Sequence, residues 1–487
     1  MNPIRSIASA IGRRLAPKAR YEGAYTSTMR THVPATITAA RYDANAMTRE
    51  ALVAKSRYFE RNSAHYNRVA DLFEQYVVGS GLHLFPASSS EEWNTRALAY
   101  WEAWQPFADI ASRQHWTTLE GLIARSWFVD GEVFILKTIG STGNPRLQLI
   151  EAHRCRTPAA VPTGSIIVDG IEVDPRGRPL AYWFEVDEIT TNGVPIRSNK
   201  FERVAADFVV HVFEPARVGQ MRGLPFVYPV LNTLHDLDDL EAYEMKAAKA
   251  AAAVEKVIKT ATGEVDDADL IRGSVTGSDG SEKAAYYKEV FAGEAKVLKH
   301  GDEIQQFGGE RPSERTAAYW DYLVGKFCIG VGIPKELVTP TSMQGTSQRA
   351  MLDVAAAWFR LRASVLAQAF GQVYEYVIAY GIERDGALRG APGDWRAFTF
   401  IPPKGPDVDA GRNSSAMIAE YKAGMRTLRD IYGESGRQWQ IELRQRADEV
   451  AEAERLAEER GITRAEVLAL DPNELSSANA AAGGNEN

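Results

Sequence analysis

The sequence contains little cysteine. Its only two cysteines, Cys155 and Cys328, are far apart among 487 residues and lack CxxC spacing. Neither a disulfide framework nor a cysteine-based zinc site is therefore expected, and a reducing cytoplasm fits this composition. No apolar run approaches the roughly 18 residues that a membrane-spanning helix needs, since the alanine-rich stretch 247–253 is interrupted by Lys249. We expect no membrane span.

An excess of positive charge is also missing. The chain has 56 lysines and arginines against 64 acidic residues, a formal net charge of −8. This balance disfavours binding nucleic acid across an open surface, so any DNA contact is expected to be local or weak. The first twenty residues are the exception, because they hold five basic residues and no acid. Such a segment imitates an organellar transit peptide, but we predict a mobile basic arm over residues 1–44.

The motifs of common active sites are absent as well. No GxxxxGK[ST] phosphate loop occurs, and the nearest stretch, Gly330–Lys335, contains Pro334 and is followed by Glu336 where a hydroxyl residue is needed. No GxSxG motif occurs either, and residues 140–143 are typical of a turn between strands. His153 to Cys155 predicts an ordinary turn rather than a metal site. We expect no catalytic residue, no cofactor and no metal.

The composition, 45% hydrophobic and 25% charged, predicts a folded protein. Apolar spacing predicts one or two amphipathic helices over 48–78 and another helix over 91–107, with tryptophans that we interpret as packing residues. Short runs between glycine, proline and asparagine turns predict a β-rich subdomain over 127–213. Its expected strands are Glu132–Thr138, Leu147–Ile150, Ser165–Val168, Leu180–Val186 and Asp207–Phe213.

Three long helices are predicted next. The first covers about 227–260, with leucines on one face and solvated acids, including Asp236, Asp238, Asp239 and Glu241, on the other. The second covers about 312–329, where Tyr319, Tyr322, Leu323, Lys326 and Phe327 are spaced for one buried face. The third covers about 347–380, with Met351, Val354, Trp358, Leu361 and Val365 at helical period.

A small mixed insertion, 261–309, separates the first two helices, and strands are expected in it at Lys296–Leu298 and Glu303–Phe307. Further on, Trp395–Ile401 predicts a strand, whereas Ser414–Tyr432 and Trp439–Arg460 predict helices. The tail from Asn473 is too polar to fold alone.

Several of these patterns together resemble the lambda-type portal protein family of tailed bacteriophages. His211–Pro215 followed by Gly219–Gly223 resembles the H-V-F-E-P…G-Q-x-R-G signature, and Pro229–Tyr243 resembles the P-V-L-x-x-L-x-D-L-D-x-x-E-x-Y helix. Gly301–Glu303 with Phe327–Pro334 matches the spacing of the later half, and Ser347–Phe370 resembles the S-x-R-A-x-L…W-x-x-F helix. The resemblance covers roughly residues 45–465, is strongest over 205–380, and fails at Ile401–Arg412.

The resemblance implies an α+β, mainly helical portal fold of wing, stem, clip and crown, with a β-rich wing subdomain and a small α/β clip, assembled as a ring. By position it implies the arm at 1–44, wing at 45–223, first stem helix at 224–260, clip at 261–310, second stem helix at 311–332, tunnel loop at 333–346, long kinked helix at 347–380, C-terminal wing at 381–436, crown at 437–470 and a disordered tail at 471–487.

The implied function is a ring of about twelve copies at one capsid vertex, a passive channel for packaging and ejecting double-stranded DNA without sequence specificity. The implied partners are further copies of the chain, the large terminase subunit, a head–tail connector, the major capsid protein and scaffold, and the ring would nucleate capsid assembly. The implied location is the virion, after assembly in the host bacterial cytoplasm.

The resemblance also assigns site residues. The tunnel loop would contact DNA through Lys335, Thr341, Ser342, Met343 and Gln344, although the same loop could be only a solvated helix cap. The stem channel face would comprise Asp236, Asp239, Glu241, Lys246 and Lys249, and the clip would meet partners through Asp266, Asp267, Asp269, Arg272 and Asp279. Two alternatives stay open: another structural virion component, such as a head–tail adaptor or major capsid protein, and a hydrolase or translocase acting on DNA.

Overall fold

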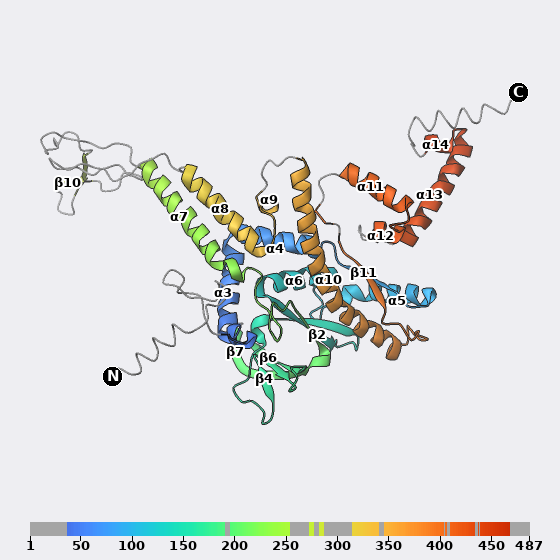
Figure 1. The fold of residues 1–487 in the computed structure, drawn as a ribbon, viewed down its shortest axis with the longest axis horizontal. Coiled ribbons are helices and arrows are strands. Elements are labelled where there is room, and N and C mark those ends of the chain that lie inside the picture. Colours follow the sequence, from blue (N-terminus) through green and yellow to red (C-terminus); the bar gives the residue numbers. More distant parts are fainter. Residues whose placement is uncertain are drawn as a thin grey trace, which may run out of the picture.

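The computed structural model describes residues 37–189, 195–253, 272–276, 282–286, 314–339, 345–403, 405–406, 410–433, 437 and 439–467. These residues form a mixed α+β subunit in which helices predominate (Figure 1). Within these ranges, each helix is too short or too polar to cross a bilayer.

Five helices precede the sheets: α2 (Ala40–Asp43), α3 (Ala46–Asn62), α4 (Ala64–Val77), α5 (Glu91–Trp104) and α6 (Trp116–Asp130). Helix α3 begins at Asn45, whose side chain accepts a hydrogen bond from the Thr48 amide. The sequence predicted α3, α4 and α5 but not α6. The apolar residues of α6 are distributed around the whole helix, and Trp116, Ile123 and Trp127 are among those that are buried. The sequence of α6 therefore lacks the contrast between an apolar and a polar face by which a helix is predicted.

Two antiparallel sheets follow. The first has the order β3-β2-β8, with β2 at Glu132–Ile139, β3 at Pro145–Glu151 and β8 at Val209–Phe213. The second has the order β4-β5-β6-β7, with β4 at Ile166–Val168, β5 at Ile171–Val173, β6 at Pro179–Ile189 and β7 at Pro195–Ala205. The strands β5 and β7 were not predicted, because β5 is short and β7 is mostly polar.

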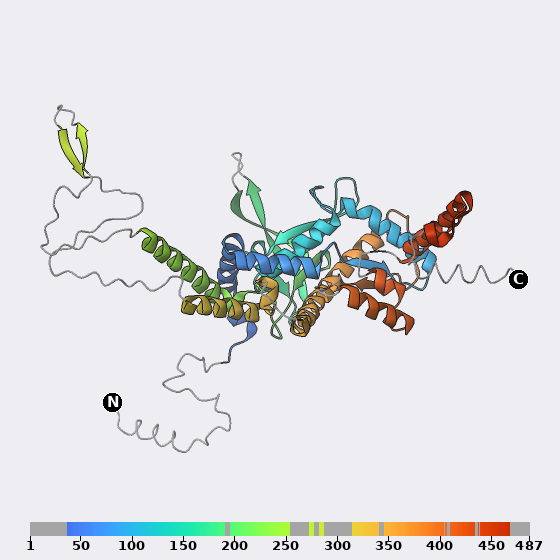
Figure 2. The same cartoon turned by 90° about the horizontal axis from the view of Figure 1, so that it is seen from above.

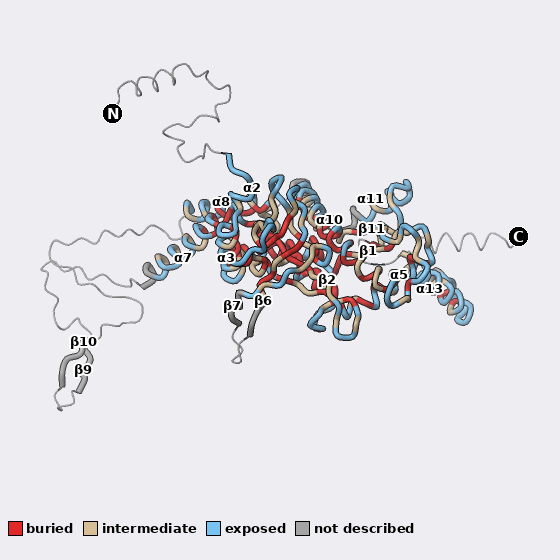
Figure 3. Tube along the Cα trace, turned by 90° about the horizontal axis from the view of Figure 1, so that it is seen from below, coloured by how far each residue is buried: buried red, intermediate tan, exposed pale blue. Residues whose placement is uncertain are grey.

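Strand β2 separates two hydrophobic cores. Its alternation places Val133 and Ile135 in the main core with the helices, and Phe134 in a second core with Tyr182 and Phe184 of the four-stranded sheet. The three-stranded sheet is therefore the layer between the helices and the outer sheet. Buried residues are concentrated in this central region (Figure 3).

The long helices continue the main core. After the short helix η5 (Tyr228–Val230), α7 extends over Leu231–Ala253 and packs beside α8 (Glu314–Val331), followed by α9 (Lys335–Val338) and α10 (Gly345–Glu383) (Figure 1). A hairpin of β9 (Arg272–Thr276) and β10 (Glu282–Tyr286) lies between α7 and α8 in sequence. The strands predicted at 296–298 and 303–307 lie outside the described residues.

The predicted buried face of α8 is partly wrong. Leu323 and Phe327 are buried, but Tyr319 and Tyr322 are 55% and 61% exposed, and Lys326 is exposed too. The buried side is completed by Val324, Cys328 and Val331, which face α7 and the core. Similarly, the periodic stripe on α10 is uncovered at Met351, Val354 and Leu361. The spacing identified the helices correctly, but part of each stripe is not covered by any residue that the structure places.

The C-terminal region contacts the N-terminal region through a short two-stranded sheet. Strand β11 (Phe398–Ile401) pairs antiparallel with β1 (His83–Pro86). Beyond it lie α11 (Ala410–Lys422), α12 (Leu428–Gly433), α13 (Trp439–Arg460) and α14 (Arg464–Val467). The single helix predicted over 414–432 is therefore two, because Gly424, with φ +72°, follows the end of α11. Most of the predicted N-terminal arm and the polar tail lie outside the described residues.

Two glycines allow backbones to cross beside β2. Gly131 ends α6 with φ +85°, and a Cβ there would lie 2.1 Å from the Leu224 carbonyl carbon. A Cβ on Gly223 would lie 2.0 Å from the Gly131 carbonyl oxygen. The segment that leads into α7 therefore lies directly against the backbone between α6 and β2. The two backbones are so close that only glycine, which has no Cβ, fits at these positions.

We predict that Gly131→Ala destabilises the fold far more than Gly164→Ala. Both glycines have φ near +86° (85° and 87°), but nothing lies within 4 Å of a Cβ on Gly164, so this control carries only the conformational penalty. The overlap with Leu224 should lower the free energy of unfolding by a further ~2–4 kcal/mol, measured by denaturant unfolding. Equal losses in the two variants would mean that the crossing is not a constraint.

Candidate functional site

The signature turn, Gly219–Gly223, lies between β8 and the helices η5 and α7. Its arginine, Arg222, has only 2% of its side chain exposed. A fully buried guanidinium needs an anion and carbonyl oxygens around it. The turn is therefore a structural joint between the β-rich subdomain and α7.

Glu132, the first residue of β2, is the anion. The Arg222 guanidinium donates from Nε to Glu132 Oε1 at 2.9 Å and from Nη2 to the same oxygen at 2.6 Å. The remaining guanidinium hydrogens are donated to the carbonyl oxygens of Ala152 at 2.9 Å, Cys155 at 3.0 Å and Asp169. The Gly223 amide also donates to Glu132 Oε2 at 2.8 Å. One arginine thus binds three separate segments of the β-rich subdomain.

A second arginine adds α3 to the same cluster. Arg49 donates to both carboxylate oxygens of Asp169, at 2.8 Å and 3.1 Å, and its Nη1 lies 3.8 Å from Glu132 Oε1. Asp169 has φ +47°, a left-handed backbone that is uncommon outside glycine. The contacts of Arg49 and Arg222 hold it there. The sequence analysis did not identify Arg49, Glu132 or Asp169, because no local motif marks residues that meet only after folding.

His211 of β8 completes this cluster, which we call the joint cluster (Arg49, Glu132, Asp169, His211 and Arg222). Its Nε2 lies 3.0 Å from Glu132 Oε2. Burial raises the pKa of Glu132, but the charge of Arg222 and the hydrogen bond from His211 outweigh burial and lower its pKa overall. Burial lowers the pKa of His211 despite the neighbouring carboxylate. Glu132 is therefore ionised and His211 neutral near pH 7.

The predicted stem residues do not share one side of α7. Glu241 accepts a hydrogen bond from Trp320 Nε1 of α8 at 2.7 Å and so lies toward α8. Asp236, Asp239, Lys246 and Lys249 are exposed, and Asp239 lies 3.2 Å from His235. At about 100° per residue, Asp236 and Lys249 are about 140° apart around the helix. The structure thus does not bring the five residues together.

Most of the residues predicted for the tunnel loop and the clip lie outside the described residues. Thr341 to Gln344 lie outside the described residues, as do Asp266, Asp267, Asp269 and Asp279. Arg272 begins β9, but its side chain is not described. Lys335, the first residue of α9, forms an ion pair with Asp321 of α8.

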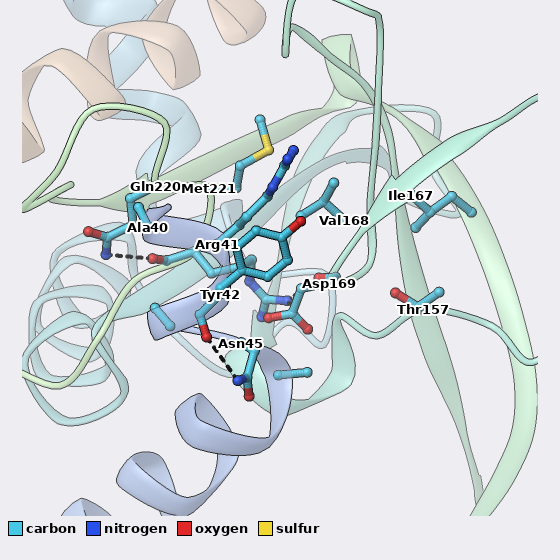
Figure 4. Close-up of a pocket in the computed structure, with 13 residues that line it drawn as sticks. Ala40, Arg41, Tyr42, Asn45, Thr157, Ile167, Val168, Asp169, Gln220 and Met221 are labelled. Atoms are coloured by element: carbon cyan, nitrogen blue, oxygen red, sulfur yellow. Dashed lines mark hydrogen bonds and ion pairs between the residues drawn. The ribbon is translucent and has the colours of Figure 1, made fainter. Parts of the chain in front are cut away.

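A cavity of about 310 Å³ lies beside the signature turn. Figure 4 shows Tyr42 and Asn45 from the α2–α3 region, Val168 from β4, and Gln220 and Met221 from the turn around it. Its lining is mainly apolar, and its carboxylate, Asp169, is paired with Arg49. The cavity offers packing contacts rather than reacting groups, and we assign it no ligand.

The described residues also offer little nucleophilic or metal chemistry. Both cysteines are buried and unbridged, and burial raises the pKa of each thiol to about 12, which keeps it protonated. Among the residues that the structure places, no group of three or more His, Cys, Asp or Glu side chains could hold a metal ion.

Comparison with known proteins identifies a family. The model of the phage portal proteins of the lambda family matches residues 28–361. A curated relative from Halomonas phage phiHAP-1, described as a probable portal protein, is 24% identical over 335 residues, 66% of this chain and 62% of its own length. The matched part thus covers less than two thirds of that relative.

Solved structures give weaker likenesses. The neck of an empty gene transfer agent particle has a TM-score of 0.45 at 11% identity, covering 82% of this chain and 96% of the other. The virion of the native particle has a TM-score of 0.41 at 12% identity, covering 79% and 94%.

We predict that the joint cluster makes the fold acid-sensitive. The pKa of His211 is lowered by folding, so below its ordinary value of about 6.5 the unfolded chain takes up a proton that the folded chain refuses. Stability should therefore fall as the pH drops from 7 toward 5. His211→Gln, which keeps a donor for Glu132, should flatten this dependence in denaturant unfolding.

The control is His235→Gln, because the His235 side chain is 67% exposed. It should leave the pH dependence unchanged. An unchanged slope in His211→Gln as well would show that the cluster does not control acid sensitivity.

Proposed function

Since the chain belongs to the lambda family of phage portal proteins, we propose that it forms a ring at one vertex of a capsid, through which double-stranded DNA is packaged and ejected. The match over residues 28–361 carries this proposal, because it includes the signature turn, both stem helices and most of the N-terminal and β-rich regions. The family is structural and not enzymatic.

The stem helices suit a passive channel wall. The exposed residues of α7 are of both signs, with Asp236 and Asp239 toward its start and Lys246 and Lys249 toward its end. A wall of mixed charge holds phosphates weakly and without sequence preference, so DNA can slide along it. We propose the tunnel loop, Lys335 to Thr346, as a second weak contact with DNA.

Movement of DNA must then come from a partner, because the sequence contains no phosphate loop. We propose that the clip, 261–310, binds the large terminase subunit during packaging and a head–tail connector afterwards, with Asp266, Asp267, Asp269, Arg272 and Asp279 at the contact. The major capsid protein and scaffold are the proposed partners around the ring. We propose that the ring is part of the virion and that it assembles in the host bacterial cytoplasm.

The test compares three full-length chains: the wild type, a deletion of 263–281 in the clip, and Met343→Glu with Gln344→Glu in the tunnel loop. Native mass spectrometry should give a ring of about 640 kDa for the wild type and the double substitution, from about twelve copies of the 53.7 kDa chain, and a ring lighter by the deleted residues for the deletion variant. In a complementation assay, the two variants should yield particles with strongly reduced DNA content. The wild-type ring should show no saturable ATP turnover.

Different failures have different meanings. Only monomers and dimers of the wild type, under several assembly conditions, would contradict the ring and favour another virion component. Saturable ATP hydrolysis would favour the translocase alternative. Normal DNA content in either variant would contradict the role of that segment while leaving the ring intact.

A further inference from the structure

The helix α8 has an apolar side that none of the described residues covers. Tyr319, Tyr322 and Ile329 are 55%, 61% and 82% exposed, and they recur at the spacing of one helix face together with Lys326. The two tyrosine rings stack, with centroids 6.1 Å apart. We call this face, opposite Val324 and Val331, the outer side of α8.

Apolar exposure continues beyond the stem. Val354 and Leu361 of α10 are 62% and 54% exposed, and Ile418, Tyr421 and Met425, in and just after α11, are 54%, 44% and 80% exposed. Figures 2 and 3 place α8, α10 and α11 along the same side of the subunit. A helix as short as α11, with 13 residues, is marginal in water without packing. Exposed apolar residues on three helices of one side are typical of a surface that is covered in an assembled protein.

The helix α7 has an outer side of different character. Asp236, Asp239 and Tyr243 fall within about 60° of one another, opposite the buried Leu234 and Leu237. Tyr243 is 66% exposed, and both aspartates are exposed. Lys246, which is exposed and lies over the Tyr243 ring, is within about 20° of Asp239 on the same side. The outer side of α7 therefore begins with two aspartates and continues with one aromatic ring and one lysine, whereas the outer side of α8 is aromatic with one lysine.

Two hydrogen bonds fix the levels of these residues. Trp320 Nε1 donates to Glu241 at 2.7 Å, and Thr316 Oγ1 donates to Glu244 at 3.3 Å. Because the two helices are antiparallel, each residue earlier on α7 corresponds to one later on α8. Tyr322 is therefore level with Asp239. By the same count, Lys326 is nearly level with Asp236.

We propose that the outer side of α8 binds the outer side of α7 of the next copy, with Tyr322 against Asp239 and Tyr243, and Lys326 against Asp236. This rests on the ring proposed above. The two outer sides differ, as a head-to-tail interface requires, and Lys326 on one is opposite in charge to Asp236 and Asp239 on the other. With the helix pair aligned along the ring axis, as this proposal requires, rotation about that axis keeps residues of one level together. This interface also removes Asp236 and Asp239 from the residues proposed to line the channel, because both then face a neighbouring copy.

The test is disulfide cross-linking of the full-length double variant Asp239→Cys with Tyr322→Cys. The native cysteines are buried and give little background. The two positions lie on opposite sides of a helix pair whose axes are about 8–10 Å apart, so they cannot form a disulfide within one chain, which needs Cα atoms within ~7 Å. We expect a ladder of covalent oligomers up to the closed ring on a non-reducing gel.

The matched control is Phe208→Cys with Tyr322→Cys. Phe208 is 54% exposed but precedes β8 in the β-rich subdomain, so no ladder is expected. Rings by native mass without a ladder in the Asp239→Cys, Tyr322→Cys variant would overturn this interface and leave the ring standing. Absence of rings in the wild type would instead contradict the proposed function.

Charge reversal gives an independent readout that needs no cysteine. Lys326→Glu should weaken association between copies about tenfold, as expected for a charged contact in an interface, and adding Asp236→Lys should restore most of the loss. Equal association of Lys326→Glu and the wild type, or no restoration in the double variant, would contradict the pairing.

Discussion

The ion pair between Arg222 and Glu132 is the contact on which the remaining architecture depends. Glu132 begins the strand that separates the two cores, and Arg222 lies in the turn that leads into α7. Both side chains are almost fully buried, with 2% and 0% exposed. A buried charge of this kind is tolerated only when its partner stays in place, so the pair fixes the β-rich subdomain relative to the start of α7. The hydrogen bonds to Ala152 and Cys155, and to Asp169, extend this constraint to the connections that follow β3 and β4.

The signature is therefore explained by structure rather than by reaction chemistry. Gly223 is required because its backbone touches Gly131, and Arg222 because it neutralises Glu132. His211, from the other half of the signature, donates a hydrogen bond from Nε2 to the same carboxylate. In the proposed ring, such a rigid joint would keep the orientation of α7 constant while partners dock and DNA passes. The charged groups of the joint cluster are buried and paired with one another, so they are not available to react with a substrate.

Much of the fold could be predicted from the sequence, but the joint cluster could not. Contrast between helix faces identified α3, α7, α8 and α10, and short β-rich runs between turns identified β2 and β3. Helix α6 was not predicted because its apolar residues are distributed around the whole helix, and β7 was not predicted because most of its residues are polar. Arg49 and Asp169 are 120 positions apart, so only the folded chain brings them together. The exposure of Tyr319 and Tyr322 was mispredicted because periodicity shows that a face will be covered but not whether the same chain covers it.

The most direct test of the joint is a double-mutant cycle on Glu132→Gln and Arg222→Met, measured as free energies of unfolding at fixed protein concentration, because assembly would otherwise contribute to the apparent stability. Arg222→Met leaves a buried carboxylate without its partner and should cost ~3–5 kcal/mol. With Glu132 already neutral, the same substitution should cost at least ~2 kcal/mol less. Losses that simply add, or a small loss in Arg222→Met alone, would contradict the claim that this pair holds the stem to the subunit.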